Sequence, residues 1–178
     1  MKGNLSTMAA TLGLLLATFI ISTVTDVSYS LDSCEPGWTS YFSDCYQYFP
    51  MQKTWTDAEL YCVSLGGNLA SVHSSSDNQF ITSLIRSRDS SGPTTWLGGS
   101  NSVQTSSWLW TDGSQWDFAN WNPGEPNNVG GTEHCLHTNF LVQGGWNDIN
   151  CANQYPFVCM INNEVEEWSE EEWSHERH

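Results

Sequence analysis

Positive charge is scarce in this chain, and the scarcity excludes one class of ligand. Only 5 of its 178 residues are Lys or Arg, against 20 that are Asp or Glu, so the formal net charge is −15. Nucleic-acid binding depends on cationic side chains that neutralise phosphates, and this composition therefore argues against a nucleic-acid partner. The sequence also lacks any Cys-x-x-Cys pair, which removes the usual spacing of a structural zinc site.

Long apolar runs are missing after residue 30. Before that point, Lys2 supplies a short positive start, and the mostly apolar segment from Ala9 to Ile21 is followed by small and polar residues. This order predicts a cleaved signal peptide over residues 1–30, because the apolar part is short for a membrane span of about 20 residues. An uncleaved signal anchor is the alternative. With cleavage, we expect a secreted, extracellular protein without stable membrane insertion.

All six cysteines lie after this segment, at Cys34, Cys45, Cys62, Cys135, Cys151 and Cys159. An even number of cysteines behind a signal peptide predicts disulfide bonds. Six cysteines allow 15 connectivities, and their spacing alone does not select one of them.

The hydrophobic pattern predicts two helices among short strands. We expect the first helix to begin near Thr56, where Thr56 and Glu59 form a capping box, and the second near Ser76, with Gln79 as its reciprocal cap. Strands are predicted over 38–49 (a pair), 68–72, 94–99, 108–110, 135–139, 145–148 and 155–161. Together they predict one α+β domain over residues 31–161.

Residues 111–132 show no regular periodicity, and a loop of this length in a compact domain is usually functional. With the nearby Trp146-Asn147-Asp148 segment, the loop supplies five oxygen-bearing side chains: Glu125, Asn127, Glu133, Asn147 and Asp148. Oxygen ligands at irregular spacing favour Ca²⁺, which accepts roughly 6–8 oxygens in flexible geometry. A cis bond before Pro126 would turn the carbonyls of Glu125 and Asn127 to the same side. The alternative is a polar surface turn with incidental acids.

The loop also contains aromatic residues, and its histidines fall outside the oxygen pattern. We expect Trp116, Phe118 and Trp121 to form a core for the loop rather than a platform for a sugar. His134 and His137 lie near the predicted ligands without belonging to them.

Glu125-Pro126-Asn127, the later Glu133 before Cys135, and Trp146-Asn147-Asp148 before Cys151 closely resemble the motifs of the C-type lectin carbohydrate-recognition domain. The resemblance covers roughly residues 34–161. It implies a C-type lectin-like fold, with two helices flanking small antiparallel sheets and a long calcium-binding loop. It also implies three disulfides: Cys34–Cys45, Cys62–Cys159 and Cys135–Cys151. Trp96-Leu97-Gly98-Gly99 matches the core motif of this family only in part, because Gly99 replaces a large apolar residue.

The same resemblance implies a function. In this family the five oxygen-bearing residues hold Ca²⁺ and contact two vicinal sugar hydroxyls. The order Glu125 then Asn127 resembles the mannose-type arrangement, which suits equatorial 3- and 4-hydroxyls, as in mannose, GlcNAc, glucose and fucose. Val129, predicted as a further sugar contact, lies where galactose-type members carry a stacking Trp. At the positions of an auxiliary calcium site, Asn128 and His134 stand where acids are usual, so a full second site is not expected. A calcium-dependent lectin that recognises microbial or host glycans in innate immunity follows, with its oligomeric state open.

Two other functions are compatible with parts of the sequence. Fish antifreeze proteins resemble the same family, although Thr94, Thr95, Thr111 and Thr132 lack the regular spacing that ice binding favours. A hydrolase would need a nucleophile beside a histidine, and no Ser or Cys arrangement of that kind is recognisable here. We therefore do not expect an enzyme.

Residues 162–178 differ in composition from the rest of the chain. They contain many glutamates and one Arg. So much like charge with little apolar surface predicts a disordered acidic tail. The alternative is a contact segment for a basic partner, anchored by Trp168 and Trp173.

Overall fold

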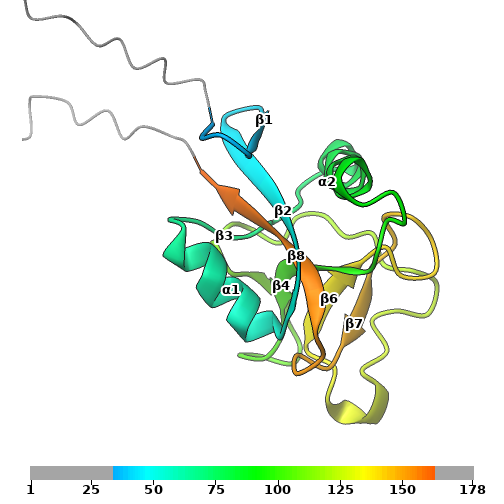
Figure 1. The fold of residues 1–178 in the computed structure, drawn as a ribbon. Coiled ribbons are helices and arrows are strands. Elements are labelled where there is room, and N and C mark those ends of the chain that lie inside the picture. The colour runs from blue at the N-terminus through cyan, green and yellow to red at the C-terminus, as the bar shows by residue number, and fades with distance from the viewer. Residues whose placement is uncertain (1–33, 163–178) are drawn as a thin grey trace, which may run out of the picture.

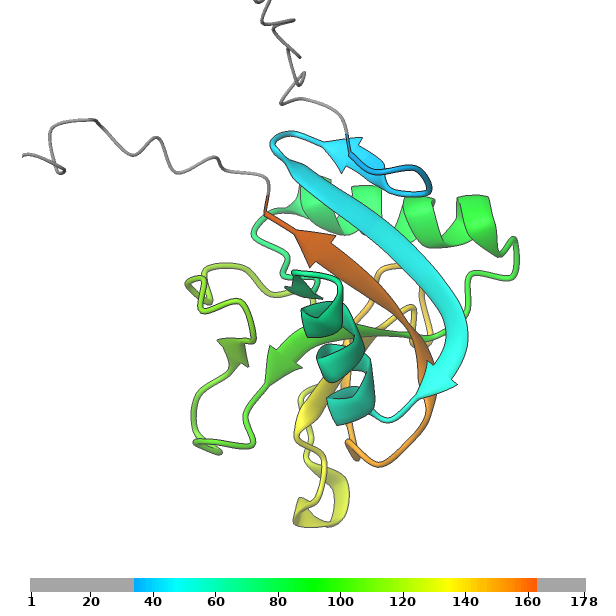
Figure 2. The same ribbon diagram turned by 60° about the vertical axis from the view of Figure 1, so that its left-hand side comes forward.

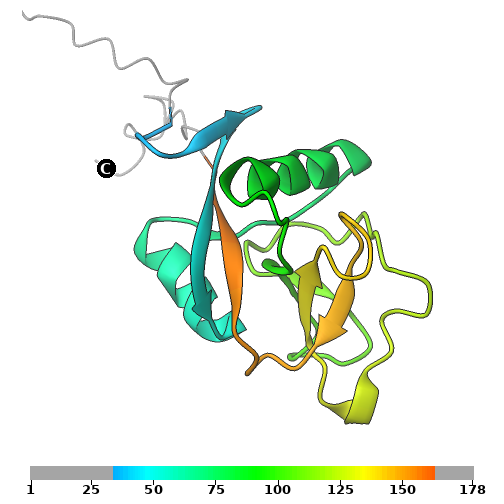
Figure 3. The same ribbon diagram turned by 45° about the vertical axis from the view of Figure 1, so that its right-hand side comes forward.

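Two long antiparallel strands, β2 (Asp44–Lys53) and β8 (Tyr155–Ile161), run through the centre of the fold (Figure 1). The computed structural model describes residues 34–162, so the predicted signal peptide and nearly all of the predicted tail lie outside the described residues. The helices α1 (Trp55–Ser64) and α2 (Ser75–Arg88) lie on opposite sides of this strand pair (Figure 3). The two expected helices are thus confirmed.

Six further strands are present: β1 (Thr39–Tyr41), β3 (Asn68–Leu69), β4 (Thr95–Ser100), β5 (Leu109–Trp110), β6 (Cys135–Thr138) and β7 (Asn147–Ile149). The strands of the described part join into one mixed sheet with the order β1-β2-β8-β4-β6-β7, while β3 pairs with β8 and β5 with β4. All pairings are antiparallel except that of β4 with β8, which is parallel at Trp96 and Phe157. The α+β class is confirmed, but the strands form one connected sheet rather than separate small ones. The remaining element is the short 3-10 helix η1 (Val129–Gly131).

Both helices begin earlier than the sequence pattern predicted. The cap of α1 is Thr54, whose hydroxyl accepts from the backbone N–H of Asp57 at 3.2 Å. The cap of α2 is Ser74, whose hydroxyl accepts from the N–H of Asp77 at 3.1 Å. Each is therefore a Ser/Thr-x-x-Asp arrangement, which satisfies one free N–H of the first turn. The predicted starts at Thr56 and Ser76 were wrong by two residues.

The three predicted disulfides are all present, with Cα–Cα distances of 5.6, 5.4 and 5.2 Å for Cys34–Cys45, Cys62–Cys159 and Cys135–Cys151. The Cys62–Cys159 bond ties α1 to β8 across a sequence separation of 97. On the chain-entropy model such a loop contributes about 4–5 kcal/mol to stability. The Cys135–Cys151 bond holds the start of β6 to the residues that follow β7.

The long loop is packed onto the sheet by aromatic rings. Trp116 occupies the space beside Gly99, where an added Cβ would lie 3.0 Å from the Trp116 ring and 3.1 Å from Leu136. The missing side chain at Gly99 thus makes room for a ring from the loop. Trp116 also contacts Trp146 at a centroid distance of 5.9 Å. The predicted loop aromatics all pack against the main core, as expected: Trp116, Phe118 and Trp121.

The two ends of the described chain and the 3-10 helix η1 lie at opposite ends of the molecule. β1 and the end of β8 are close to each other, and η1 is at the far end from them (Figures 1 and 2). Within residues 34–162 no helix has the length and apolar character needed to cross a membrane.

Candidate functional site

The loop is fastened to the sheet just before the predicted ligands. Trp121 forms an isolated parallel bridge with Trp146. Next to it, the buried Asn122 donates its backbone N–H to the carbonyl of Trp146 at 3.0 Å. Its side-chain amide donates to the carbonyls of Phe140 at 2.7 Å and Trp146 at 3.1 Å. The N–H of Glu125 then donates to the Asn122 carbonyl at 3.0 Å, so Asn122 sets the turn that presents Glu125.

Asp148 holds the backbone that follows Pro126. The Glu125–Pro126 bond is cis. The Asp148 carboxylate, fully buried on β7, accepts from the backbone N–H groups of Asn127 and Asn128, both at 2.9 Å. Charge-assisted hydrogen bonds therefore join the loop after Pro126 to strand β7.

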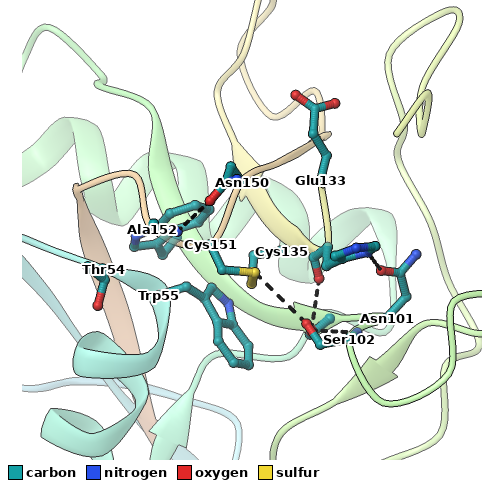
Figure 4. Close-up of a disulfide and its surroundings, with 12 residues drawn as sticks. Thr54, Trp55, Asn101, Ser102, Glu133, Cys135, Asn150, Cys151 and Ala152 are labelled. Carbon is teal, nitrogen blue, oxygen red and sulfur yellow. Dashed lines mark hydrogen bonds between the residues drawn. A yellow bond between two sulfur atoms is a disulfide. The ribbon is translucent and has the colours of Figure 1, made fainter. Parts of the chain in front are cut away.

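Glu133 closes the same segment from its other side. Its Oε2 accepts from the N–H of Val129 at 2.9 Å, and its own N–H donates to Oδ1 of Asn128 at 3.0 Å. The N–H of Val129 also contacts Oδ1 of Asn127 at 3.1 Å. The Val129 side chain is 62% exposed. Figure 4 shows Glu133 just before the Cys135–Cys151 disulfide, with its carboxylate directed away from the sulfur atoms.

Glu125 carries negative charge that nothing in the described part neutralises. Its Oε2 is buried and has no hydrogen-bond partner among these residues. Desolvation raises the pKa of Glu125 above its ordinary value, and the charge of Asp148, a side-chain hydrogen bond with Asp148 and the charge of Glu133 raise it further. The backbone hydrogen bond from Asn127 acts in the opposite direction. Carboxylates this close favour either a shared proton or a cation.

Asn147, the fifth predicted ligand, is 4% exposed and has its amide nitrogen turned inward. Nδ2 donates to the carbonyl of Asp148 and to Nε2 of His137, the latter at 3.0 Å. Burial lowers the pKa of His137 to about 4, so its ring is neutral at physiological pH. The sequence pattern left His137 outside the site. The signal that would have included it is the strand register, which places His137 opposite Asn147.

The donor chemistry of this group fits Ca²⁺. Glu125, Asn127, Glu133 and Asp148 form one network, and Asn147 joins it through Asp148. Among residues 34–162, no group of three or more His, Cys, Asp or Glu is arranged to hold a metal ion by itself. The predicted shell differs from such a group because it mixes three carboxylates with two amides. Every donor is oxygen, and the unpartnered Oε2 of Glu125 is the kind of atom that a hard cation satisfies.

A second polar group lies outside the loop site. Nδ1 of His73 is 2.8 Å from Oδ1 of Asp117, and its Nε2 is 3.1 Å from Oγ of Ser71. The sequence offered no sign of this arrangement, which brings Ser, His and Asp together. The pocket beside it is also lined by three carboxylates: Asp44, Asp77 and Asp112. Their charge would oppose the oxyanion of an acyl transfer, so the surroundings are unsuited to hydrolysis.

Two helices, a mixed sheet and three bridging disulfides, with an oxygen-rich loop at one end of the sheet, agree with the C-type lectin-like fold that the sequence resembles. The C-type lectin domain matches the sequence over residues 51–161, and the chain belongs to the C-type lectin family. Members of this family are carbohydrate-binding proteins rather than enzymes.

Named relatives extend this comparison. A protein named lectin from Pleurodeles waltl is 45% identical over 130 residues, which cover 72% of this chain and 76% of that protein. The lactose-binding lectin l-2 of Anguilla japonica is 41% identical over 133 residues, covering 72% and 78% of the two chains. Among solved structures, the herring type II antifreeze protein superimposes with a TM-score of 0.68 at 29% identity, covering 72% and 98% of the two chains.

Proposed function

We propose that this protein is a secreted, calcium-dependent lectin of mannose-type specificity that recognises glycans on microbial or host surfaces. One observation carries the proposal. The charges of Asp148 and Glu133 both act on the Glu125 carboxyl, and Glu125 keeps a buried oxygen without a partner in the described part. Desolvation, and then the charges of Asp148 and Glu133, raise the pKa of Glu125, and a cation at this point would stabilise its ionised form.

Glu125, Asn127, Glu133, Asn147 and Asp148 are the residues that would hold the ion. When bound, Ca²⁺ supplies open coordination positions for two vicinal sugar hydroxyls. Asn127 lies exposed on the loop, so its amide can donate to one hydroxyl while the Glu125 carboxylate accepts from another. Asp148 and Glu133 hold the backbone on which both groups stand.

The sugar preference rests on the order of acid and amide. Glu125 followed by Asn127 resembles the mannose-type arrangement, and Val129 leaves the loop without the stacking Trp of galactose-type members. The name of the eel relative, a lactose-binding lectin, refers to the other class of sugar. The binding experiment must therefore include both mannose and galactose.

The experiment is retention on mannose resin and on galactose resin, each with calcium and then with EDTA. We expect retention on mannose that EDTA abolishes. The double variant E125Q/N127D exchanges the acid and the amide, and we expect it to shift retention toward galactose. The control E35Q/N153D makes the same two chemical changes at exposed positions outside the loop and should behave like the natural protein. Retention on mannose that survives EDTA contradicts the proposal.

Ice binding is the second candidate, favoured by the superposition on the herring antifreeze protein. Thermal hysteresis of the purified protein separates the two functions. Hysteresis together with no retention on any sugar resin would replace the lectin proposal with this one.

Secretion belongs to the same proposal. We expect cleavage of the signal peptide within or just after residues 25–30, a lectin domain that extends to residue 161, and an acidic tail over residues 162–178. N-terminal sequencing of the protein recovered from culture medium tests the first boundary. Recovery in the cells only, with Met1 still present, contradicts it.

A further inference from the structure

We propose that His137 is a positioning residue of the calcium site: its Nε2 accepts a hydrogen bond from the Asn147 amide and so keeps the amide oxygen available for the cation. This role rests on the proposed function, because it is exerted on Asn147, one of the proposed ligands. His137 is 1% exposed, so we place it outside the contacts to the ion and the sugar and assign its effect to the hydrogen bond with Asn147.

The orientation of the Asn147 amide follows from its neighbours. The backbone carbonyl of Asp148 can only accept a hydrogen bond, so the amide nitrogen must be the atom that faces it. The same nitrogen lies 3.0 Å from Nε2 of His137. An N–H cannot donate to another N–H, and Nε2 must therefore carry the lone pair while the ring proton sits on Nδ1. Both contacts engage the nitrogen, which leaves the Asn147 oxygen as the free side-chain atom.

The ring of His137 cannot turn to find another partner. It stacks on Phe140 at a centroid distance of 5.4 Å and meets the edge of Tyr155 at 5.1 Å. Trp96 contacts it at 5.9 Å. The strand register of β6 and β7 places its backbone directly opposite Asn147. The imidazole is thus held by packing in the orientation in which Nε2 meets the amide.

A histidine at position 137 destabilises the fold unless its hydrogen bond with Asn147 has a role. Its other nitrogen, Nδ1, is buried and has no partner in the described part. A buried polar atom without a partner destabilises the folded state, and a phenylalanine would fill the same aromatic surroundings without leaving such an atom. Among residues 34–162 the one hydrogen bond of this side chain is with Asn147, so we assign the role of the imidazole to that contact.

The first test needs no calcium. Nitrogen-15 NMR of the metal-free protein reports which ring nitrogen of His137 carries the proton. We expect the form with the proton on Nδ1. A proton on Nε2 would mean that the ring donates to the Asn147 oxygen, and the proposal would then be overturned.

The second test uses calcium titrations followed by tryptophan fluorescence. H137F keeps an aromatic ring and removes the acceptor, and we expect it to weaken calcium binding about tenfold or more, as loss of an outer partner of a ligand typically does. H137Q retains an acceptor oxygen and should stay within about threefold of the natural protein. H73F removes a histidine that contacts Asp117 and Ser71 instead, and should leave calcium binding unchanged.

A variant ligand separates positioning from packing. The carboxylate of N147D has two equivalent oxygens, so one of them faces the ion whichever way the group is turned. Adding H137F to N147D should therefore weaken calcium binding no further. Equal losses in H137F and H137Q, or an equal further loss in the N147D background, would show a packing role and overturn the proposal. Melting curves in EDTA confirm that each variant folds. If the natural protein binds no calcium, the proposed function fails, and the NMR result still decides the orientation of Asn147.

Discussion

At the scale of single residues, Glu125 stands out because folding makes its ionised form less favourable. Desolvation and the neighbouring acids raise its pKa in the folded state. A carboxyl whose folded pKa lies above the unfolded value contributes stability at low pH, and that contribution is lost as pH rises through the folded pKa. At neutral pH the ionised Glu125 therefore destabilises the metal-free loop, and bound calcium removes this penalty.

The substitution E125Q tests both sides of this balance. In EDTA we expect the variant to melt about 1–4 °C higher than the natural protein, because the repulsion with Asp148 is gone. In calcium we expect it to lose retention on mannose resin, because a carboxylate ligand is lost. E35Q removes one charge from an exposed position and controls for net charge. A lower melting temperature of E125Q in EDTA is incompatible with this account.

The limits of sequence reasoning are also visible among individual residues. The five proposed ligands could be named from the sequence because their chemistry and motif order are local properties of the chain, and their role in binding calcium stays a prediction. Asn122 and His137 could not, since their importance comes from contacts with Trp146 and Asn147 across the β6–β7 region. Such contacts depend on strand register, which the pattern of polar and apolar residues left open.

At the scale of elements, the helix caps show how a distant contact decides between two local signals. Thr54-x-x-Asp57 and Thr56-x-x-Glu59 are both compatible with a capping box. The structure uses the first, because Glu59 instead accepts from Asn68 at 2.6 Å and from the N–H of Leu69 at 2.8 Å. The sequence predicted that a helix exists here, but its start was set by a strand that follows it.

Alanine substitutions separate these caps. T54A and S74A should each lower the free energy of unfolding by about 1 kcal/mol, because each leaves an N–H of the first turn without its partner. T56A and S76A, at the exposed positions that the sequence favoured, should change it by less than about 0.5 kcal/mol. Urea unfolding of the four variants is the measurement. The reverse ranking would return the caps to the sequence-based positions.

The loop over residues 111–132 is an element with two kinds of support. Its aromatic rings pack on the core, while its acidic end depends on hydrogen bonds to Asp148 and Glu133. With an extracellular affinity of about 10⁻⁴ to 10⁻³ M, a tenfold excess of calcium adds only about 1.4 kcal/mol of stability. In EDTA we therefore expect limited proteolysis near Gly124 or Gly130, with the core intact. Complete digestion at the same protease concentration would contradict this division.

At the scale of the whole molecule, the disulfide pairing was the main long-range feature that could be predicted from the sequence. Their pairing followed from the family resemblance, and it joins α1 to β8 and β6 to the segment after β7. The parallel pairing of Trp96 with Phe157 was not predictable, because it joins strands that are distant in the sequence and neither strand alone encodes it. The same pairing merges the strands into one sheet and so places β7, with Asn147 and Asp148, beneath the loop.

Acid should destabilise the whole fold through His137. Its pKa falls from an ordinary 6.5 to about 4 in the folded state because the ring is buried. As pH falls from about 6.5 toward 4, the unfolded chain takes up the proton first, so stability decreases across this window by about 3 kcal/mol. Glu125 acts in the opposite direction, since its raised pKa favours the folded state in acid.

The comparison with H137F isolates the histidine, because phenylalanine does not titrate and both proteins keep Glu125. Urea unfolding in EDTA, measured at pH 7, 6, 5 and 4, should show the natural protein losing about 2–3 kcal/mol more than the variant. Most of the difference should arise below pH 6, where the unfolded histidine is largely protonated. Parallel profiles for the two proteins would mean that His137 is solvated and protonated in the folded state, which would remove the buried imidazole from this account of stability.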